Sequence, residues 1–145
     1  MSDDFGRGVL APLSRERVEQ ALQANEWHYQ VDSDGDVGGI WDDNVFYFFI
    51  SGEQNEILNI RGRWHHSLRI EQRAEAREVI DIWHQERLWP KGYTHVDDDG
   101  KLRIFAEHVV DWEFGLTDEQ LLQTISCALS SSLQLFQHLA EHFGK

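Results

Sequence analysis

The last turns of the chain contain a spacing of residues that matches a catalytic metal motif. His138, Glu141 and His142 fit the inverted zinc-protease pattern His-x-x-Glu-His, which places both histidines on one face of a helix as a metal-binding pair. Such a site needs a further protein ligand, which that enzyme class supplies from downstream residues. Only three residues follow, and none of them is a zinc ligand. We therefore expect no metal cofactor, and a metal-dependent hydrolase is the least favoured interpretation.

Three alternate aspartates, Asp32, Asp34 and Asp36, are similar to the start of a calcium-binding loop. The sixth position of such a loop requires glycine because the backbone turns sharply there, but Val37 occupies that position. A polar turn between two strands explains the three aspartates better.

The adjacent histidines and the single cysteine do not indicate a reactive site. His65 and His66 follow one another, and adjacent residues of a strand point to opposite faces, so we expect them not to bind one metal ion together. Cys127 lies among apolar and small residues of a predicted helix, with no basic neighbour to activate its thiol. The sequence also contains no Ser-His-Asp arrangement, phosphate-binding loop or dinucleotide fingerprint.

One group of residues favours binding to another molecule. Arg61 and Arg63 alternate on one predicted strand, and Lys101 and Arg103 alternate on another, whose Phe105 shares the same face. If the two strands lie in one sheet, these side chains form a basic and aromatic patch. Such a patch would suit an acidic peptide or a second subunit.

The apolar run from Val45 to Ile50 is predicted to be a strand at the centre of the fold, and the other elements are expected to pack around it. A strand sends alternate side chains to opposite faces, so both faces of this strand carry large apolar groups. Helices of the same chain can cover one face, and the other face needs more of the chain or a second molecule.

The remaining pattern predicts an α+β fold, with an antiparallel sheet of about six strands and three helices in the order α-β-β-β-β-α-β-β-α. Ser14 is predicted to cap the first helix, and Thr117 with Gln120 forms a capping box before a helix that reaches about Phe143. The expected strands are Trp27 to Val31, Val37 to Trp41, Val45 to Ile50, Ile57 to Trp64, Tyr93 to Asp97 and Leu102 to Trp112. The middle helix contains the apolar stripe Ala76, Val79, Ile80 and Trp83, and Pro90 ends it.

The composition limits the class of protein. The chain has 145 residues with a net charge of −13, which repels nucleic acid, and we expect one domain from residue 14 to 145 after a flexible tail of residues 1–13. Its single cysteine fits a reducing compartment. No signal peptide or membrane-inserting segment is expected, so the predicted location is the cytoplasm.

Several landmarks resemble the YbjN family over roughly residues 14 to 143. They are Trp41, Trp64, Trp83-His84, Pro90-Lys91-Gly92-Tyr93, Asp98-Asp99-Gly100, Gly115-Leu116-Thr117 and Gln120-Leu121. The resemblance implies a bacterial sensory transduction regulator whose fold is similar to that of type III secretion chaperones, which are dimers that bind extended segments of partner proteins. No catalytic signature is among these landmarks.

We therefore predict a non-enzymatic, regulatory or chaperone-like protein that binds a segment of an unidentified partner protein, with a small-ligand-sensing domain as the alternative. A homodimer formed through the uncovered sheet face is also expected. If the turn at Gly52 has an even number of residues, the uncovered face carries Phe46, Phe48 and Ile50, whereas an odd number exposes Val45, Tyr47 and Phe49 instead. The candidate interaction surface on the even alternative is Phe46, Phe48, Ile50, Arg61, Arg63, Arg103 and Phe105.

Overall fold

A computed structural model describes residues 9–145 as one antiparallel sheet with three helices, which confirms the predicted fold class and element order. The helices are α1 (Arg15–Ala24), α2 (Arg73–Glu86) and α3 (Asp118–Phe143), with a short 3-10 helix, η1 (Ile70–Gln72), before α2. The strands are β1 (Gln30–Val31), β2 (Val37–Trp41), β3 (Asn44–Ser51), β4 (Ile57–Arg63), β5 (Lys91–Val96) and β6 (Leu102–Asp111). Their order across the sheet is β1-β2-β3-β4-β6-β5.

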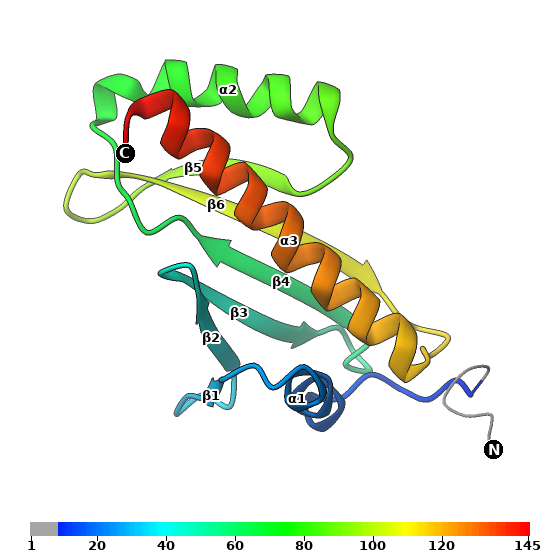
Figure 1. The fold of residues 1–145 in the computed structure, drawn as a ribbon. Coiled ribbons are helices and arrows are strands. Elements are labelled where there is room, and N and C mark those ends of the chain that lie inside the picture. The colour runs from blue at the N-terminus through cyan, green and yellow to red at the C-terminus, as the bar shows by residue number, and fades with distance from the viewer. Residues whose placement is uncertain (1–8) are drawn as a thin grey trace.

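The helices cover one face of this sheet, and α3 crosses it diagonally (Figure 1). Close packing is possible because small residues lie beneath the helices. A Cβ atom added to Gly92 of β5 would lie 3.1 Å from Leu135 of α3 and 3.3 Å from Ile80 of α2. The core between sheet and helices includes fully buried Leu58 and Ile60 from β4.

The direction of the β3 side chains corrects part of the sequence interpretation. The turn between Ser51 and Ile57 contains an odd number of residues, 52 to 56, so Phe48 pairs with Ile60 and Ile50 with Leu58. Phe46 and Phe48 are therefore buried in the core, and Ile50 packs against it. Their placement on the uncovered face was wrong, and the odd-turn alternative applies.

The local signals at the helix ends are confirmed. The Ser14 hydroxyl accepts a hydrogen bond from the Arg17 amide, and Thr117 and Gln120 form the reciprocal capping box of α3. The first strand is shorter than expected, with Gln30–Val31 in place of Trp27 to Val31. The reason is that Trp27 first bonds back to the Leu22 carbonyl, which ends α1, and only then does the chain become extended.

The segment before α1 is held to the rest of the domain where it is described. Ala11 exchanges two main-chain hydrogen bonds with Leu116, and the Arg17 guanidinium donates to the carbonyls of Ala11, Pro12 and Leu116. Ala11 to Leu13, which the sequence analysis assigned to the tail of residues 1–13, therefore contact the packed domain. Val9 and Leu10 of that tail are exposed, and its residues 1–8 lie outside the described residues. Within 9–145, no helix has both the length and the apolar character needed to cross a membrane.

Candidate interaction surfaces

The sheet face opposite the helices, which we call the outer face, brings together residues from four strands. The register places Arg61 of β4 between Tyr47 of β3 and Glu107 of β6, and Arg63 between Val45 and Phe105. The two strands proposed to carry the basic patch are therefore neighbours in one sheet. Arg61, Arg63, Arg103 and Phe105 lie on this face, as the alternation predicts.

Stacked aromatic pairs lie on both sides of these arginines. Tyr47 and Phe49 stack with ring centroids 5.4 Å apart, and Tyr93 of β5 stacks on Phe105 at the same separation of 5.4 Å. The Arg61 guanidinium lies 4.9 Å from the Phe49 ring centroid. Each aromatic ring is half-buried by its neighbours, so the outer face presents flat apolar surfaces between charged groups.

The acidic groups of the outer face are already paired. Glu107 Oε2 lies 3.3 Å from Arg61 Nε, an ion pair without hydrogen-bond geometry at that nitrogen, and it accepts a hydrogen bond from Asn59. Burial and then the Glu107 carboxylate raise the pKa of Tyr93. Asp97 accepts hydrogen bonds from the Lys101 amide and from Arg103, which hold the pKa of its carboxyl below the usual range. Arg63 is exposed and has no ion pair within residues 9–145.

Sequence reasoning missed several residues of the outer face. Tyr47 and Phe49 were assigned to it only on the alternative of an odd turn, and Tyr93 and Lys91 were not assigned at all. The parity of the 52–56 turn would have identified the first two. The other two depend on the pairing of β5 with β6, in which Tyr93 is opposite Phe105 and Lys91 is opposite Glu107.

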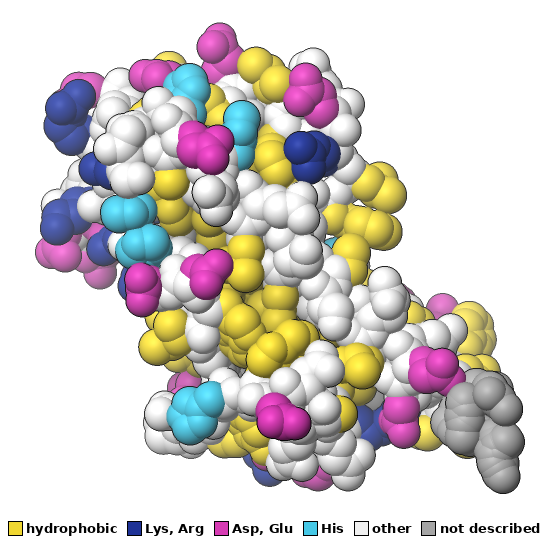
Figure 2. All heavy atoms as spheres, in the orientation of Figure 1, with side chains coloured by type: hydrophobic (Ala, Val, Ile, Leu, Met, Phe, Trp, Pro, Cys, Tyr) yellow, Lys and Arg dark blue, Asp and Glu magenta, His cyan; other side chains and the backbone are white. Residues whose placement is uncertain are grey.

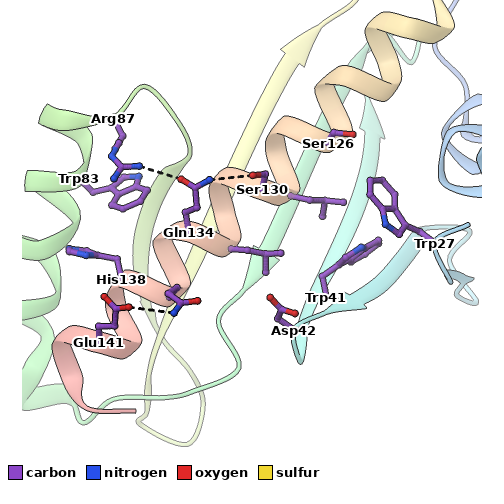
Figure 3. Close-up of a pocket in the computed structure, with 13 residues that line it drawn as sticks. Trp27, Trp41, Asp42, Trp83, Arg87, Ser126, Ser130, Gln134, His138 and Glu141 are labelled. Atoms are coloured by element: carbon purple, nitrogen blue, oxygen red, sulfur yellow. Dashed lines mark hydrogen bonds between the residues drawn. The ribbon is translucent and has the colours of Figure 1, made fainter. Parts of the chain in front are cut away.

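A second surface lies on the helix side, where an open groove of about 680 Å³ runs along α3. Figure 3 shows Trp27 and Trp41 on one side of α3, and Trp83 with Arg87 on the other. Figure 2 shows hydrophobic side chains gathered in the hollow beside α3, toward the β1 and β2 end of the sheet. Because it is open and lined mostly by one helix, this groove does not enclose a ligand.

The polar groups along the groove are bonded to one another and do not converge on one point. Arg87 donates to Gln134, which in turn donates to Ser130, and Arg87 also lies 4.6 Å from the centre of the Trp83 ring (Figure 3). Glu141 accepts a hydrogen bond from Gln137.

The three residues of the zinc-protease pattern have separate partners. The His138 ring packs on Trp83 with centroids 5.5 Å apart, while His142 Nε2 lies 2.7 Å from a Glu75 carboxylate oxygen on α2. Among residues 9–145, these side chains do not gather their ligand atoms into one metal-sized group.

The aspartate turn does gather its carboxylates. Ligand atoms of Asp32, Asp34 and Asp36 lie within 4.8 Å of one another. Asp32 Oδ1 already accepts the amides of Asp34 and Asp36, which is the hydrogen bonding of a polar turn. Partial burial, followed by repulsion from Asp32 and Asp34, raises the pKa of Asp36.

The two adjacent histidines correct another expectation. The rings of His65 and His66 lie 4.0 Å apart and do not point to opposite faces. Both residues follow the end of β4, where the alternation of an extended strand no longer applies. His65 instead bonds to the Asn44 side chain, through both its amide and its ring.

Added zinc should leave the melting temperature unchanged. A ligand that binds only the native state must stabilise it, but the His138 ring packs on Trp83 and the His142 ring already contacts Glu75. Differential scanning fluorimetry with stoichiometric zinc measures this. A rise of several degrees that His138→Ala abolishes would restore the metal hypothesis.

The sequence profile described as "Putative bacterial sensory transduction regulator", YbjN, matches residues 14–141. The chain belongs to the YbjN family. No curated protein matches the chain at a significant level.

Two solved structures share the YbjN fold seen here. One is the crystal structure of YbjN, "a putative transcription regulator from E. coli", with a TM-score of 0.78, 10% sequence identity, and coverage of 92% of this chain and 96% of that chain. The other is an uncharacterized protein from Methanothermobacter thermautotrophicus, with a TM-score of 0.60, 16% identity, and coverage of 90% and 99%. At these identities the similarity shows the fold alone.

Proposed function

We propose that this protein is a non-enzymatic, chaperone-like regulatory protein of the cytoplasm, which binds an acidic segment of a partner protein on the outer face of its sheet. The observation that carries the proposal is the set of arginines beside stacked aromatic pairs on the sheet face opposite the three helices. The family description, a regulator, agrees with a role in binding. The single cysteine supports a reducing compartment.

Charge complementarity indicates the kind of segment. The whole chain carries −13, yet Lys91, Arg61, Arg63 and Arg103 lie on one sheet face. Glu107 and Asp97 neutralise Arg61 and Arg103, which leaves Arg63 and Lys91 for a partner. The stacked rings beside these two residues offer apolar contact. An extended segment with alternating acidic and apolar residues fits both features.

The other classes of function fit less well. A sheet face with arginines and aromatic rings can also stack nucleic acid bases, but the net charge of −13 opposes the approach of a phosphate backbone. A ligand sensor needs an enclosed cavity, and the α3 groove is open. An enzyme needs convergent polar groups, whereas those along this groove bond to one another.

Short synthetic peptides test the proposal directly. One set alternates acidic and apolar residues, and the matched set replaces every acidic residue by lysine. The acidic set should bind more tightly, and Arg63→Glu should weaken binding about tenfold because it reverses the unpaired charge. The control is Arg77→Glu, which makes the same charge change on the exposed surface of α2. Equal binding of the two sets, equal losses in the two variants, or tighter binding of single-stranded DNA would overturn the proposal.

A further inference from the structure

Strand β6 has β4 on one edge and β5 on the other, and it continues past the point where β5 begins. On one side, β6 pairs with β4 as far as Asp111, where the partner is Ile57. On the other side, β5 pairs only with Leu102 to Glu107, because β5 begins at Lys91. The residue before it is Pro90, which has no amide hydrogen to donate to a sheet. Figure 1 shows the chain turning away from the sheet there toward α2. Residues 108 to 111 therefore form an open edge.

The hydrogen bonds at the two ends of β6 show which main-chain groups face this open edge. Trp64 donates to the Ile104 carbonyl, and Trp112 donates to the Glu56 carbonyl, so even-numbered residues of β6 bond toward β4. Odd-numbered residues face the other side. The amide and carbonyl groups of Val109 and Asp111 thus point to the open edge, and no main-chain partner for them exists within residues 9–145.

Apolar side chains lie beside these unpaired groups. Leu88 is 80% exposed, Trp89 45% and Val109 54%, which are high values for residues of this size. A cleft of about 420 Å³ separates the Leu88–Trp89 loop from the end of β6. The Trp89 ring also covers the ring of buried His108, at a centroid distance of 5.2 Å. An unpaired strand edge with exposed apolar neighbours is a surface on which another strand can pair.

We infer that β6 of a second copy pairs with this edge, antiparallel and about a twofold axis at Val110. In that register Val109 of one copy lies opposite Asp111 of the other, and their two sets of amide and carbonyl groups form four hydrogen bonds. Val109 and Asp111 lie roughly 7 Å apart along the strand. Each copy contributes the hydrogen-bonding groups of these same two residues, as a twofold interface requires.

The charges near the edge agree with this register. Asp111 lies opposite Val109 of the other copy, so the two Asp111 carboxylates do not face one another. Continuing the antiparallel register by two residues brings Glu113 of the second copy level with Glu107, the position at which Lys91 of β5 lies opposite Glu107 in the sheet. Strand β6 ends at Asp111, so the chain of the second copy leaves the sheet there and presents Glu113 to Lys91. The interface gains two such pairs of opposite charge.

This dimer differs from the one expected from the sequence, which used the sheet face. Pairing edge to edge gives one continuous sheet whose two outer faces lie on the same side, so both remain available to partners. The inference does not depend on the proposed function, because it rests on the main-chain edge of β6 and shares only Lys91 with the outer face.

Sedimentation equilibrium on the purified full chain tests the inference. We expect a concentration-dependent dimer of the 17.0 kDa chain. Val109→Pro removes an amide that only the second copy uses, and should raise the dissociation constant about 10- to 100-fold, while Val109→Thr keeps the amide and the dimer. A monomer at all concentrations, or a dimer with the same dissociation constant in folded Val109→Pro, would overturn the inference.

A charge exchange tests the register without altering the main chain. Lys91→Glu should weaken the dimer, and adding Glu113→Lys to that variant should restore it.

Amide hydrogen exchange gives a residue-level measurement of the same interface. The amides of Val109 and Asp111 should become protected as concentration rises, while that of Val110, bonded within the β4–β6 pair, should not change. Protection confined to residues of the outer face would assign the dimer to that face and contradict the inference.

Discussion

Replacing Phe46 by alanine should lower the free energy of unfolding by about 3–5 kcal/mol. The side chain is fully buried on the helix-covered face. Its ring contacts Trp41, at a centroid distance of 5.7 Å, and Phe136 of α3, at 6.1 Å. Alanine would leave a cavity at the contact between sheet and helix, which the surrounding aromatic rings cannot fill without breaking their own contacts.

Urea denaturation followed by tryptophan fluorescence measures this loss. The matched control is Phe49→Ala, which removes the same ring from the outer face of the same strand. This substitution removes the stacking on Tyr47 and the contact with the Arg61 guanidinium, so we expect the free energy of unfolding to fall by only about 1–2 kcal/mol. Equal costs, or a larger cost for Phe49, would contradict the placement of Phe46 in the core and of Phe49 on the outer face.

Replacing Gly62 by alanine should cost about 1–3 kcal/mol, although it adds only one methyl group. Gly62 lies opposite Phe46 in the β3–β4 pair, and the aromatic ring occupies the space above its Cα. An added Cβ would lie 2.3 Å from Cε2 of that ring, far inside van der Waals contact. The ring cannot move away because Trp41 and Phe136 hold it.

A double-mutant cycle can assign that cost to the Phe46 ring. Phe46→Leu frees part of the space above Gly62, so Gly62→Ala should be less destabilising in that background than in the wild-type chain. Independent costs would show that the methyl group acts through some other contact. Circular dichroism should show the same secondary structure in all four proteins.

Local signals in the sequence determined most of the secondary structure. The boundaries of α1 and α3 follow from side chains that bond to the nearest free amides, as Ser14 and Thr117 do. The alternation along β4 and β6 identified their buried and outward residues, because in an extended chain neighbouring side chains point to opposite faces whatever surrounds them. The same alternation grouped Arg61 with Arg63, and Arg103 with Phe105, as outward residues of their own strands, and the pairing of β4 with β6 then put both groups on one face.

Only the tertiary structure decided which face of β3 is covered. All six residues from Val45 to Ile50 are apolar or aromatic, so their pattern favours neither direction. The choice depends on the turn of residues 52 to 56, where Gly52 and Asn55 have positive φ angles of 99° and 57°. One residue more or fewer in that turn would exchange the two faces, because the side-chain period of a strand is two residues.

The pairing of β5 was likewise invisible in the sequence. Strands that meet across the sheet come from distant parts of the chain, and their register depends on how the helices between them pack. That register brings Tyr93 onto Phe105 and Lys91 beside Glu107. Within residues 9–145 it leaves the last residues of β6 paired with β4 alone. Composition and periodicity describe each strand separately, whereas a surface made by several strands exists only after they have paired.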